Sequence, residues 1–467
     1  MKLRLWQREC IQQAINAYQT QRHFLCLATP GAGKTVMAVA LAKRLLSDGH
    51  VDFVLCFSPS TAVAHGFRES FEQIVGMPFD GGLGARGDSL TYQHMATLSQ
   101  RTWDLLKHHK VFVIFDEIHH CGGDELLGAN IWGSLILQHV KYDAAFTLSL
   151  SGTPWRTDNI PVVLANYEMG SIDCDYVYGL QQAIQDEVCR IPTMVAIDNS
   201  RIEFEHQGGT DQFHSLACLL ESGHCGYQSV LNNRQIIQQI LKRAIRQLDA
   251  LRRANSSAGG LVVASSVVHA QMILEMLCQE FNQDAVLVSH KDEAALQKIH
   301  DFKMGTSPWI VSVGMISEGT DIPRLQVCCH LSFVKTELYF RQILGRVVRR
   351  TQSANEIAYL YFPAQPALVE YAHRVAEDIP EFEHAFISKV EAADTPIAVM
   401  APASDPSVPI GSLIKTFGED CVDDISLDLK ALEGLSQSNT EYVLNELSQL
   451  RVYGRYKQTV IELHSCL

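Results

Sequence analysis

The chain has 467 residues, of which 47% are hydrophobic and 19% are charged, and its formal net charge is −14. This composition excludes a wholly disordered chain, and the length predicts about three domains. No apolar run approaches the roughly 18 residues that a membrane helix needs, and the first residues do not have the pattern of a signal peptide. The 13 cysteines, an odd number in a large chain, indicate reduced thiols. We therefore expect a cytoplasmic protein without a membrane partner.

The negative charge is concentrated near the C-terminal end of the sequence. Residues 376–467 contain 16 acidic and 6 basic side chains, a net charge of −10, which leaves −4 for residues 1–375. An acidic chain argues against a nucleic-acid partner, because phosphates favour a basic surface. The nearly neutral body can still present a local basic surface, so net charge alone does not exclude nucleic acid.

Two sets of short apolar runs alternate with helical patterns along the chain. The helical patterns include 35–47 and 232–254. The alternation of strands with helices predicts βαβ units, and therefore an α/β fold with two tandem parallel-sheet domains. The apolar runs predict buried parallel strands at 23–29, 51–59, 110–117 and 145–152, and again at 259–266, 284–290, 307–313, 326–332 and 356–362.

These patterns divide the chain into four regions. We expect a first α/β domain at 1–198, a linking segment with an entry helix at 199–258, and a second α/β domain at 259–375. Residues 376–467 form an acidic and mostly helical C-terminal region with a linker at about 397–412, which is rich in Pro, Ala and Ser. No motif assigns a role to this region, and both a solvated appendage and a docking site for a protein partner fit its composition.

A glycine-rich loop follows the first predicted strand and opens the first long helix. The segment Ala28-Thr29-Pro30-Gly31-Ala32-Gly33-Lys34-Thr35 fits the Walker A pattern, with Ala in place of the first Gly. Gly31 and Gly33 allow backbone amides to wrap around phosphate oxygens. We expect Lys34 to reach the β- and γ-phosphates of ATP and the Thr35 hydroxyl to bind Mg²⁺.

An acidic pair stands at the end of the strand predicted at 110–117. Asp116 and Glu117 lie at the carboxyl end of a buried strand, where open α/β sheets bind their ligands. Asp116 is expected to hold Mg²⁺, and Glu117 to polarise the water that attacks the γ-phosphate. Together with the loop, the pair predicts ATP hydrolysis.

The tetrad Asp116-Glu117-Ile118-His119 resembles motif II of the DExH-type helicases of superfamily 2. The resemblance covers roughly residues 1–375, where further motifs follow in family order. Leu150-Ser151-Gly152-Thr153-Pro154 resembles motif III, and this likeness implies that Ser151 and Thr153 couple the ATP site to the nucleic-acid site.

Three further segments of the first domain resemble motifs of the same family. Ser58 and Thr91 stand in segments that resemble motifs Ia and Ib, which implies contacts with a nucleic-acid backbone. Gln7 belongs to a segment that resembles the N-terminal Leu-Arg-x-Tyr-Gln element, which implies that its amide selects adenine. The alternative for Gln7 is an exposed glutamine on a helix.

The second domain resembles the C-terminal half of these helicases. The segment 261–270 resembles motif IV, with Ser265 as a candidate phosphate contact, and Glu318-Gly319-Thr320-Asp321 resembles motif V. The latter likeness implies close backbone approach at Gly319, a nucleic-acid contact at Thr320 and hydrogen bonds from the ribose to Asp321.

The segment Gln342-Ile343-Leu344-Gly345-Arg346-Val347-Val348-Arg349 matches motif VI. Arg346 and Arg349 are three residues apart, so a helix would place them on one face. Such a pair can act as arginine fingers on the γ-phosphate, and we assign Gln342 to the same catalytic group. The alternative is a solvated basic face of a helix.

The resemblance implies an ATP-dependent helicase or translocase that hydrolyses ATP with Mg²⁺ between two RecA-like domains. DNA is favoured over RNA, because motif III followed by Trp155-Arg156-Thr157-Asp158 is similar to DNA-repair and type III restriction subunits. Only 20 residues separate Asp321 from Gln342, which leaves no room for an inserted strand-splitting hairpin. Translocation is therefore as consistent with the sequence as unwinding. The alternatives are an ATPase switch subunit that docks a partner through the C-terminal region, an RNA helicase and a degenerate ATPase.

Overall fold

The computed structural model describes residues 2–124, 128–153, 160–206, 208–314, 316, 320, 322–351, 357–379, 382–390 and 450–465. The chain forms two compact units, the first with residues 1–189 and 318–321 and the second with residues 190–317 and 322–467. Among the described residues, no helix combines the length and the hydropathy that crossing a bilayer requires.

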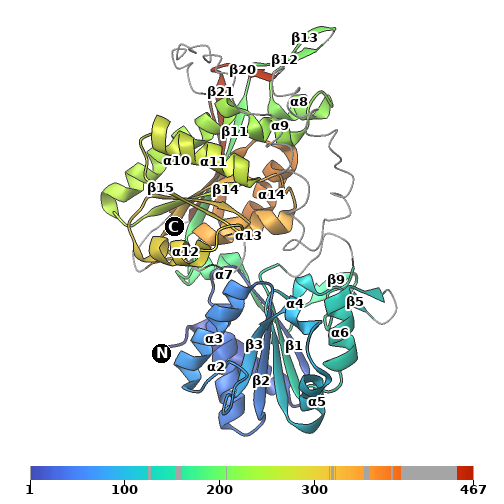
Figure 1. Cartoon of the computed structure of the whole chain (residues 1–467). Coiled ribbons are helices and arrows are strands. Elements are labelled where there is room, and N and C mark those ends of the chain that lie inside the picture. Colours follow the sequence, from blue (N-terminus) through green and yellow to red (C-terminus); the bar gives the residue numbers. More distant parts are fainter. Residues whose placement is uncertain are drawn as a thin grey trace. The chain divides into compact units, whose positions relative to one another are not determined.

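A parallel sheet forms the centre of the first unit, with the strand order β10-β1-β7-β4-β2-β3 (Figure 1). All its strand pairs are parallel. Every residue of β4 is buried, as expected for an apolar run that is covered on both faces. The strands are β1 (His23–Ala28), β2 (Phe53–Ser58), β3 (Gly87–Thr91), β4 (Val111–Phe115), β7 (Phe146–Ser151) and β10 (Tyr176–Tyr178).

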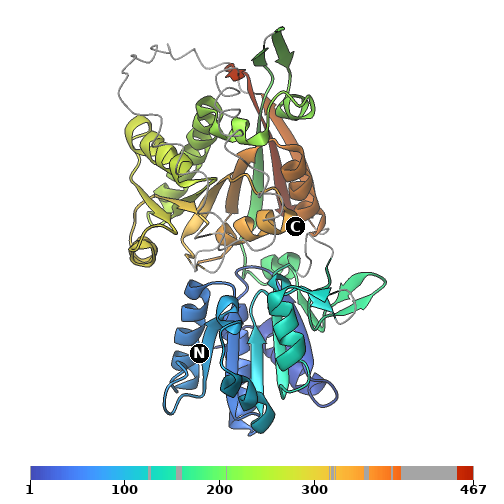
Figure 2. The ribbon, with the colours of Figure 1, turned by 45° about the vertical axis from the view of Figure 1, so that its right-hand side comes forward.

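Helices cover this sheet, and two short antiparallel pairs, β5–β6 and β8–β9, lie beside it (Figure 2). The core on one side contains Phe57, Val113, Phe115 and Ile118, all fully buried. The remaining elements are α1 (Leu5–Ala17), α2 (Lys34–Ser47), α3 (Thr61–Val75), α4 (Tyr92–Met95), α5 (Gln100–His108), η1 (Ile118–His120), β5 (Gly123–Asp124), β6 (Gly128–Ala129), α6 (Ile131–His139), β8 (Asn166–Glu168), β9 (Ser171–Asp173) and α7 (Leu180–Gln185).

The second unit contains a larger, mixed sheet with the order β15-β16-β14-β17-β18-β11-β21-β19. The strands from β15 to β11 pair in parallel, whereas β21 is antiparallel to both β11 and β19. The strands are β11 (Ile191–Asn199), β14 (Gly259–Ala264), β15 (Ala285–Ser289), β16 (Trp309–Val313), β17 (Leu325–Leu331), β18 (Ile357–Pro363), β19 (Phe382–Val390) and β21 (Tyr456–Ser465).

The long helix α10 of the second unit shows how sequence builds these layers. Asn233 caps its N-terminus by accepting from the amides of Gln235 and Ile236, and its isoleucine and leucine face is buried.

A small antiparallel sheet has the order β13-β12-β20. The remaining elements are β12 (Ile202–His206), β13 (Gly209–Phe213), α8 (Leu216–Glu221), α9 (Tyr227–Asn232), α10 (Arg234–Ala254), α11 (Val267–Glu275), η2 (Met276–Glu280), α12 (Ala295–Met304), α13 (Glu337–Val347), α14 (Pro366–Glu377) and β20 (Leu450–Val452).

The two tandem parallel-sheet domains and the strands predicted for them are confirmed, but the predicted boundary at residue 198 is wrong. Strand β11 pairs in parallel with β18, with Ile191 opposite Ile357, so residues 190–198 belong to the second unit. The segment 199–258 is likewise part of the second unit, where it forms β12, β13 and α8 to α10.

The mostly helical character predicted for the C-terminal region is wrong for its described part beyond α14. Residues 382–390, 450–452 and 456–465 are strands β19, β20 and β21. The reason is tertiary pairing, because β21 forms backbone ladders on both sides and buries Val460 and Ile461. The linker predicted at 397–412 lies outside the described residues.

Candidate functional site

The glycine-rich loop connects the end of β1 at Ala28 to the start of α2 at Lys34. Gly31 and Gly33 have φ angles of 86° and 96°, in the left-handed region that favours glycine. A Cβ atom at Gly33 would also lie 3.0 Å from Gln7 Nε2. Both glycines are therefore needed for the turn that brings the chain from the strand into the helix N-terminus.

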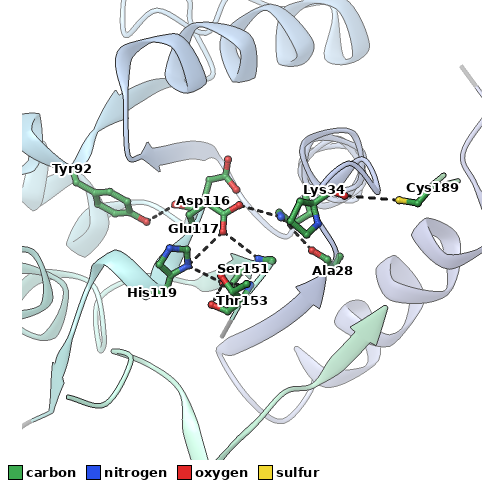
Figure 3. A network of polar contacts seen from close by, with 11 residues as sticks. Ala28, Lys34, Tyr92, Asp116, Glu117, His119, Ser151, Thr153 and Cys189 are labelled. Carbon is green, nitrogen blue, oxygen red and sulfur yellow. Dashed lines mark hydrogen bonds and ion pairs between the residues drawn. The ribbon is translucent and has the colours of Figure 1, made fainter. Parts of the chain in front are cut away.

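Lys34 and Glu117 form an ion pair at this loop, with Lys34 Nζ 3.1 Å from Glu117 Oε1 (Figure 3). The same ammonium group donates to the carbonyl of Ala28 over 3.2 Å. Glu117 lies in the left-handed region, with φ 51° and ψ 55°, and its Oε2 accepts from the amide of Gly152 over 3.1 Å. Lys34 and the Glu117 carboxylate thereby link the ends of β1, β4 and β7.

The electrostatic surroundings of Glu117 favour its charged form. Burial by itself would raise the pKa of this carboxyl group. The charges of Lys34 and His119, with hydrogen bonds from the Gly152 amide and Lys34, outweigh burial and lower the pKa to about 2. Glu117 is therefore ionised at neutral pH.

Asp116 and Thr35, the residues predicted to hold Mg²⁺, carry oxygen atoms of the kind that this ion binds. Asp116 is 7% exposed at the end of β4, where the hydroxyl of Tyr92 donates to its carbonyl over 2.8 Å. Thr35 is the second residue of α2. Mg²⁺ in nucleotide sites is held by one or two protein oxygens together with phosphates and water, so this small donor set fits the ion.

The segment predicted as motif III connects η1 to the loop. Ser151 Oγ lies 3.0 Å from Nδ1 of the buried His119, donates to the carbonyl of Thr153 over 2.8 Å and accepts from the Thr153 amide over 3.1 Å. A Cβ atom at Gly152 would lie 3.0 Å from Pro30 Cγ and 3.1 Å from Lys34 Nζ. The close approach of Gly152 to the loop leaves little room for a side chain at this position.

Gln7 is 3% exposed, so it is not the exposed helix glutamine of the alternative interpretation. Its Nε2 donates to the carbonyl of Gly33 over 3.0 Å, and its Oε1 accepts from the amide of Arg4 over 2.9 Å. Arg4 Nη1 donates to the carbonyl of Ala32 over 2.6 Å. Arg4, for which the sequence predicts no role, fastens α1 to the loop together with Gln7. Adenine selection by Gln7 stays a prediction.

Ser58 and Thr91, the predicted nucleic-acid contacts of the first unit, have buried side chains. Ser58 is fully buried at the end of β2, with its hydroxyl 3.7 Å from Cys56 Sγ. Thr91 is 5% exposed, and its hydroxyl caps α4 by accepting from the amide of His94. Both hydroxyls have local partners, and their contacts with nucleic acid stay predictions.

In the second unit, Ser265 is partly exposed and its hydroxyl lies 2.7 Å from His269 Nδ1. Burial lowers the pKa of His269 to about 4, so the neutral ring accepts the hydrogen bond. Thr320 is buried, whereas Gly319 and Asp321 lie outside the described residues. The phosphate contact of Ser265 stays a prediction.

Motif VI departs from the predicted single helix face. Helix α13 ends at Val347, where the amide of Val348 donates to the carbonyl of Leu344, so Arg349 lies beyond the helix. Gln342 and Arg346 are 6% and 7% exposed, which excludes a solvated basic helix face at Arg346. Residues 322–341 contain β17 and the start of α13, so no hairpin is inserted there.

Two domain families match the chain. Residues 1–156 match the family "Type III restriction enzyme, res subunit", and residues 237–351 match the family "Helicase conserved C-terminal domain". The uncharacterized protein Rv2917 of Mycobacterium tuberculosis is 30% identical over 387 residues, or 79% of this chain, and the chain spans 62% of that relative's length. The ATP-dependent RNA helicase dbp3 of Schizosaccharomyces pombe is 27% identical over 145 residues, which are 29% of this chain and 25% of dbp3.

Solved structures share the fold at low sequence identity. A fragment assigned to the HsdR subunit of a type I restriction enzyme from Vibrio vulnificus has a TM-score of 0.54 and 16% identity, over 79% of this chain and 65% of that chain. The restriction-modification enzyme LlaBIII bound to DNA has a TM-score of 0.53 and 13% identity, over 81% of this chain and 30% of that chain. Dbp5 of S. cerevisiae bound to RNA and ADP BeF3 has a TM-score of 0.53 and 12% identity, over 82% of this chain and 89% of that chain.

The order of these two families along the chain agrees with the order of the two main sheets and with the glycine-rich loop at the first of them. The chain therefore carries the two domains of a superfamily 2 helicase, one of the type III restriction res-subunit family followed by a conserved helicase C-terminal domain.

Proposed function

We propose that the chain is a DExH-type, ATP-dependent nucleic-acid translocase or helicase, with DNA favoured over RNA. The observation that carries this proposal is the 3.1 Å ion pair of Lys34 with Glu117, to which Gly152 adds an amide. Three strand ends of one parallel sheet thus converge where α/β proteins bind ligands. A salt bridge with only a structural role would not require the glycine-rich loop beside it.

The contacts suggest how hydrolysis is timed. Lys34 would leave Glu117 to bind the β- and γ-phosphates of ATP, which removes the charge that lowers the pKa of Glu117. Glu117 would then become a better acceptor for the proton of the attacking water. Thr35 and Asp116 would hold Mg²⁺, which supplies charge neutralisation at the phosphate oxygens.

The second unit would supply the positive charge for the transition state. We assign this role to Arg346 and Arg349, with Gln342 beside them, because arginine fingers accelerate related reactions by about 10³–10⁵. In this proposal, ATP binding and product release alternately bring the two units together and apart along the nucleic acid. The inserted hairpin is absent between β17 and α13, so we propose translocation rather than strong unwinding.

The preference for DNA is supported by the restriction-enzyme family of residues 1–156 and by the fold shared with LlaBIII bound to DNA. The sequence feature behind it, Trp155 to Asp158, lies outside the described residues. An RNA substrate is the second candidate, and the similarity to dbp3 and to Dbp5 bound to RNA favours it.

ATP turnover by the full chain should be measured alone and with single-stranded and duplex DNA and RNA, at stated salt concentrations because phosphate binding is salt-dependent. We expect DNA to increase turnover more than RNA does. A larger increase with RNA would select the RNA helicase. Equal turnover under all conditions would contradict the translocase and favour an ATPase switch subunit.

A further inference from the structure

A buried arginine lies where the chain passes from the first unit to the second. The first unit's main segment ends at Cys189 and the second unit begins at Arg190, so these two neighbours lie where the chain passes from one unit to the other. Arg190 is 1% exposed, which is rare for an arginine and requires hydrogen-bond partners for its guanidinium group.

The guanidinium group of Arg190 joins three separate backbone segments of the second unit. Nη1 donates to the carbonyls of Leu325 over 2.5 Å and of Val347 over 2.8 Å, and Nη2 donates to the carbonyl of Pro323 over 3.0 Å. The backbone amide of Arg190 donates to the carbonyl of Val348 over 2.7 Å. Arg190 therefore caps the C-terminal end of α13 with a positive charge, where the helix dipole favours a cation.

The capped helix end lies within the candidate arginine-finger segment. Val347 and Val348 stand between Arg346 and Arg349, so two carbonyls of this short stretch accept hydrogen bonds from one residue. The planar guanidinium fork fixes direction as well as distance. Arg190 thus holds two backbone carbonyls on the path of the chain from Arg346 to Arg349.

The preceding residue has a contact with the nucleotide-binding loop of the first unit. Cys189 Sγ lies 3.9 Å from the carbonyl oxygen of Pro30, at the range of a weak thiol hydrogen bond (Figure 3). The Cys189 amide donates to the carbonyl of Ala183 at the end of α7. Two consecutive residues thus contact the loop in one unit and the finger segment in the other.

We propose that Arg190 is a positioning residue for ATP hydrolysis, which fixes the segment of Arg346 and Arg349 to the unit boundary. A movement of the chain at this boundary would then also move Arg346 and Arg349. The inference rests on the proposed function, because it assigns Arg190 a role in stimulated ATP turnover and none in ATP binding.

A matched control for Arg190 exists in the same unit. Arg324 is 7% exposed and also donates to three backbone carbonyls, those of Phe302, Ser257 and Ser307. None of these carbonyls belongs to α13 or to the segment that follows it. Replacing either arginine should therefore cost the second unit comparable stability, whereas only Arg190 should affect the fingers.

The experiment compares Arg190→Met, Arg190→Lys and Arg324→Met in the full chain. Steady-state ATP turnover with saturating DNA gives kcat and KM, binding of a fluorescent ATP analogue gives Kd, and thermal unfolding gives Tm. For Arg190→Met we expect kcat to fall by about ten- to a hundredfold, because small misplacements of catalytic groups cost this much. KM and Kd should stay within about twofold, and Arg190→Lys should recover part of kcat.

Arg324→Met should lower Tm as Arg190→Met does while it keeps the wild-type kcat. An equal loss of kcat in both variants, in proportion to their unfolding, would reduce Arg190 to a structural residue and overturn the inference. Wild-type kcat in Arg190→Lys would also overturn it, even if Arg190→Met does not fold. Absence of DNA- or RNA-stimulated turnover in the wild type would instead reject the proposed function and this inference together.

Discussion

The two units hold their candidate catalytic side chains by different means. In the first unit, side-chain contacts hold Glu117, which lies 3.1 Å from Lys34 Nζ and 3.5 Å from His119 Nδ1. In the second unit, the segment of Arg346 is held through backbone carbonyls that accept from Arg190. The first arrangement depends on each charge and on pH, whereas the second depends on the path of the backbone. Single charge changes should therefore affect the first unit most.

The largest effect should come from Lys34→Ala, which removes the cation from the loop. We expect ATP affinity and turnover both to fall, with turnover at the background, because the phosphates lose their side-chain charge and Glu117 loses its partner. Steady-state turnover and ATP-analogue binding measure both effects. Lys43→Ala on the exposed face of the same helix is the control and should keep wild-type values. Full activity in Lys34→Ala would refute the site.

Glu117→Gln separates binding from chemistry. The amide keeps the size of the side chain but cannot accept a proton, so turnover should fall by about 10²–10⁴ while ATP binding is retained. The exposed Glu69→Gln on α3 serves as the control. If Glu117→Gln and wild type turn over ATP equally, another group accepts the proton.

Two glycine-to-alanine substitutions, one in each unit, should have smaller effects than the changes at Lys34 and Glu117. In Gly152→Ala, the added Cβ would press on Pro30 and Lys34, so we expect the Kd for ATP to rise by about tenfold, or 1.4 kcal/mol. In Gly260→Ala, the Cβ would lie 2.3 Å from the ring of Trp309, which should cost about 1–3 kcal/mol of unfolding free energy without changing ATP affinity. Titration with an ATP analogue and urea unfolding measure the two effects, and the reverse pattern would contradict the assignment.

The smallest effect should be a pH dependence of stability in the first unit. Because the pKa of Glu117 is lowered to about 2 in the folded chain, its ionised form stabilises the fold above its ordinary pKa, and this contribution is lost as pH falls toward 2. The difference in unfolding free energy between wild type and Glu117→Gln should therefore shrink as pH falls from neutrality. A difference that does not vary with pH would show that the ion pair with Lys34 contributes nothing to stability.

Local patterns were enough to predict some parts of the molecule. Strands such as 110–117 were predicted because a run of buried, β-rich residues needs no distant information, and the loop at Gly31 and Gly33 was predicted because its conformation requires glycine. The order of the motifs also predicted the two tandem domains.

Other parts depend on partners that are far away in the sequence. The pairing of β11 with β18 moved the domain boundary, and the pairing of β21 with β11 and β19 made strands where a helix was predicted. No sequence motif predicts the role of Arg190, because its hydrogen-bond acceptors are backbone carbonyls, which any residue could supply. The local partners of the Ser58 and Thr91 hydroxyls could not be predicted either, because residue type does not show which groups a side chain meets in the folded chain.

The position of β21 in the sheet affects how the second unit folds during synthesis and which truncations it tolerates. During synthesis, β11 emerges long before β21. Until β21 pairs with it, one edge of β11 is unpaired and can form hydrogen bonds with a strand of another chain. A truncation of residues 413–467, intended to remove a docking region, would leave that edge open permanently and produce aggregation that resembles loss of a partner. Any search for a partner of the acidic region should therefore keep residues 450–465 and remove only the chain between β19 and β20.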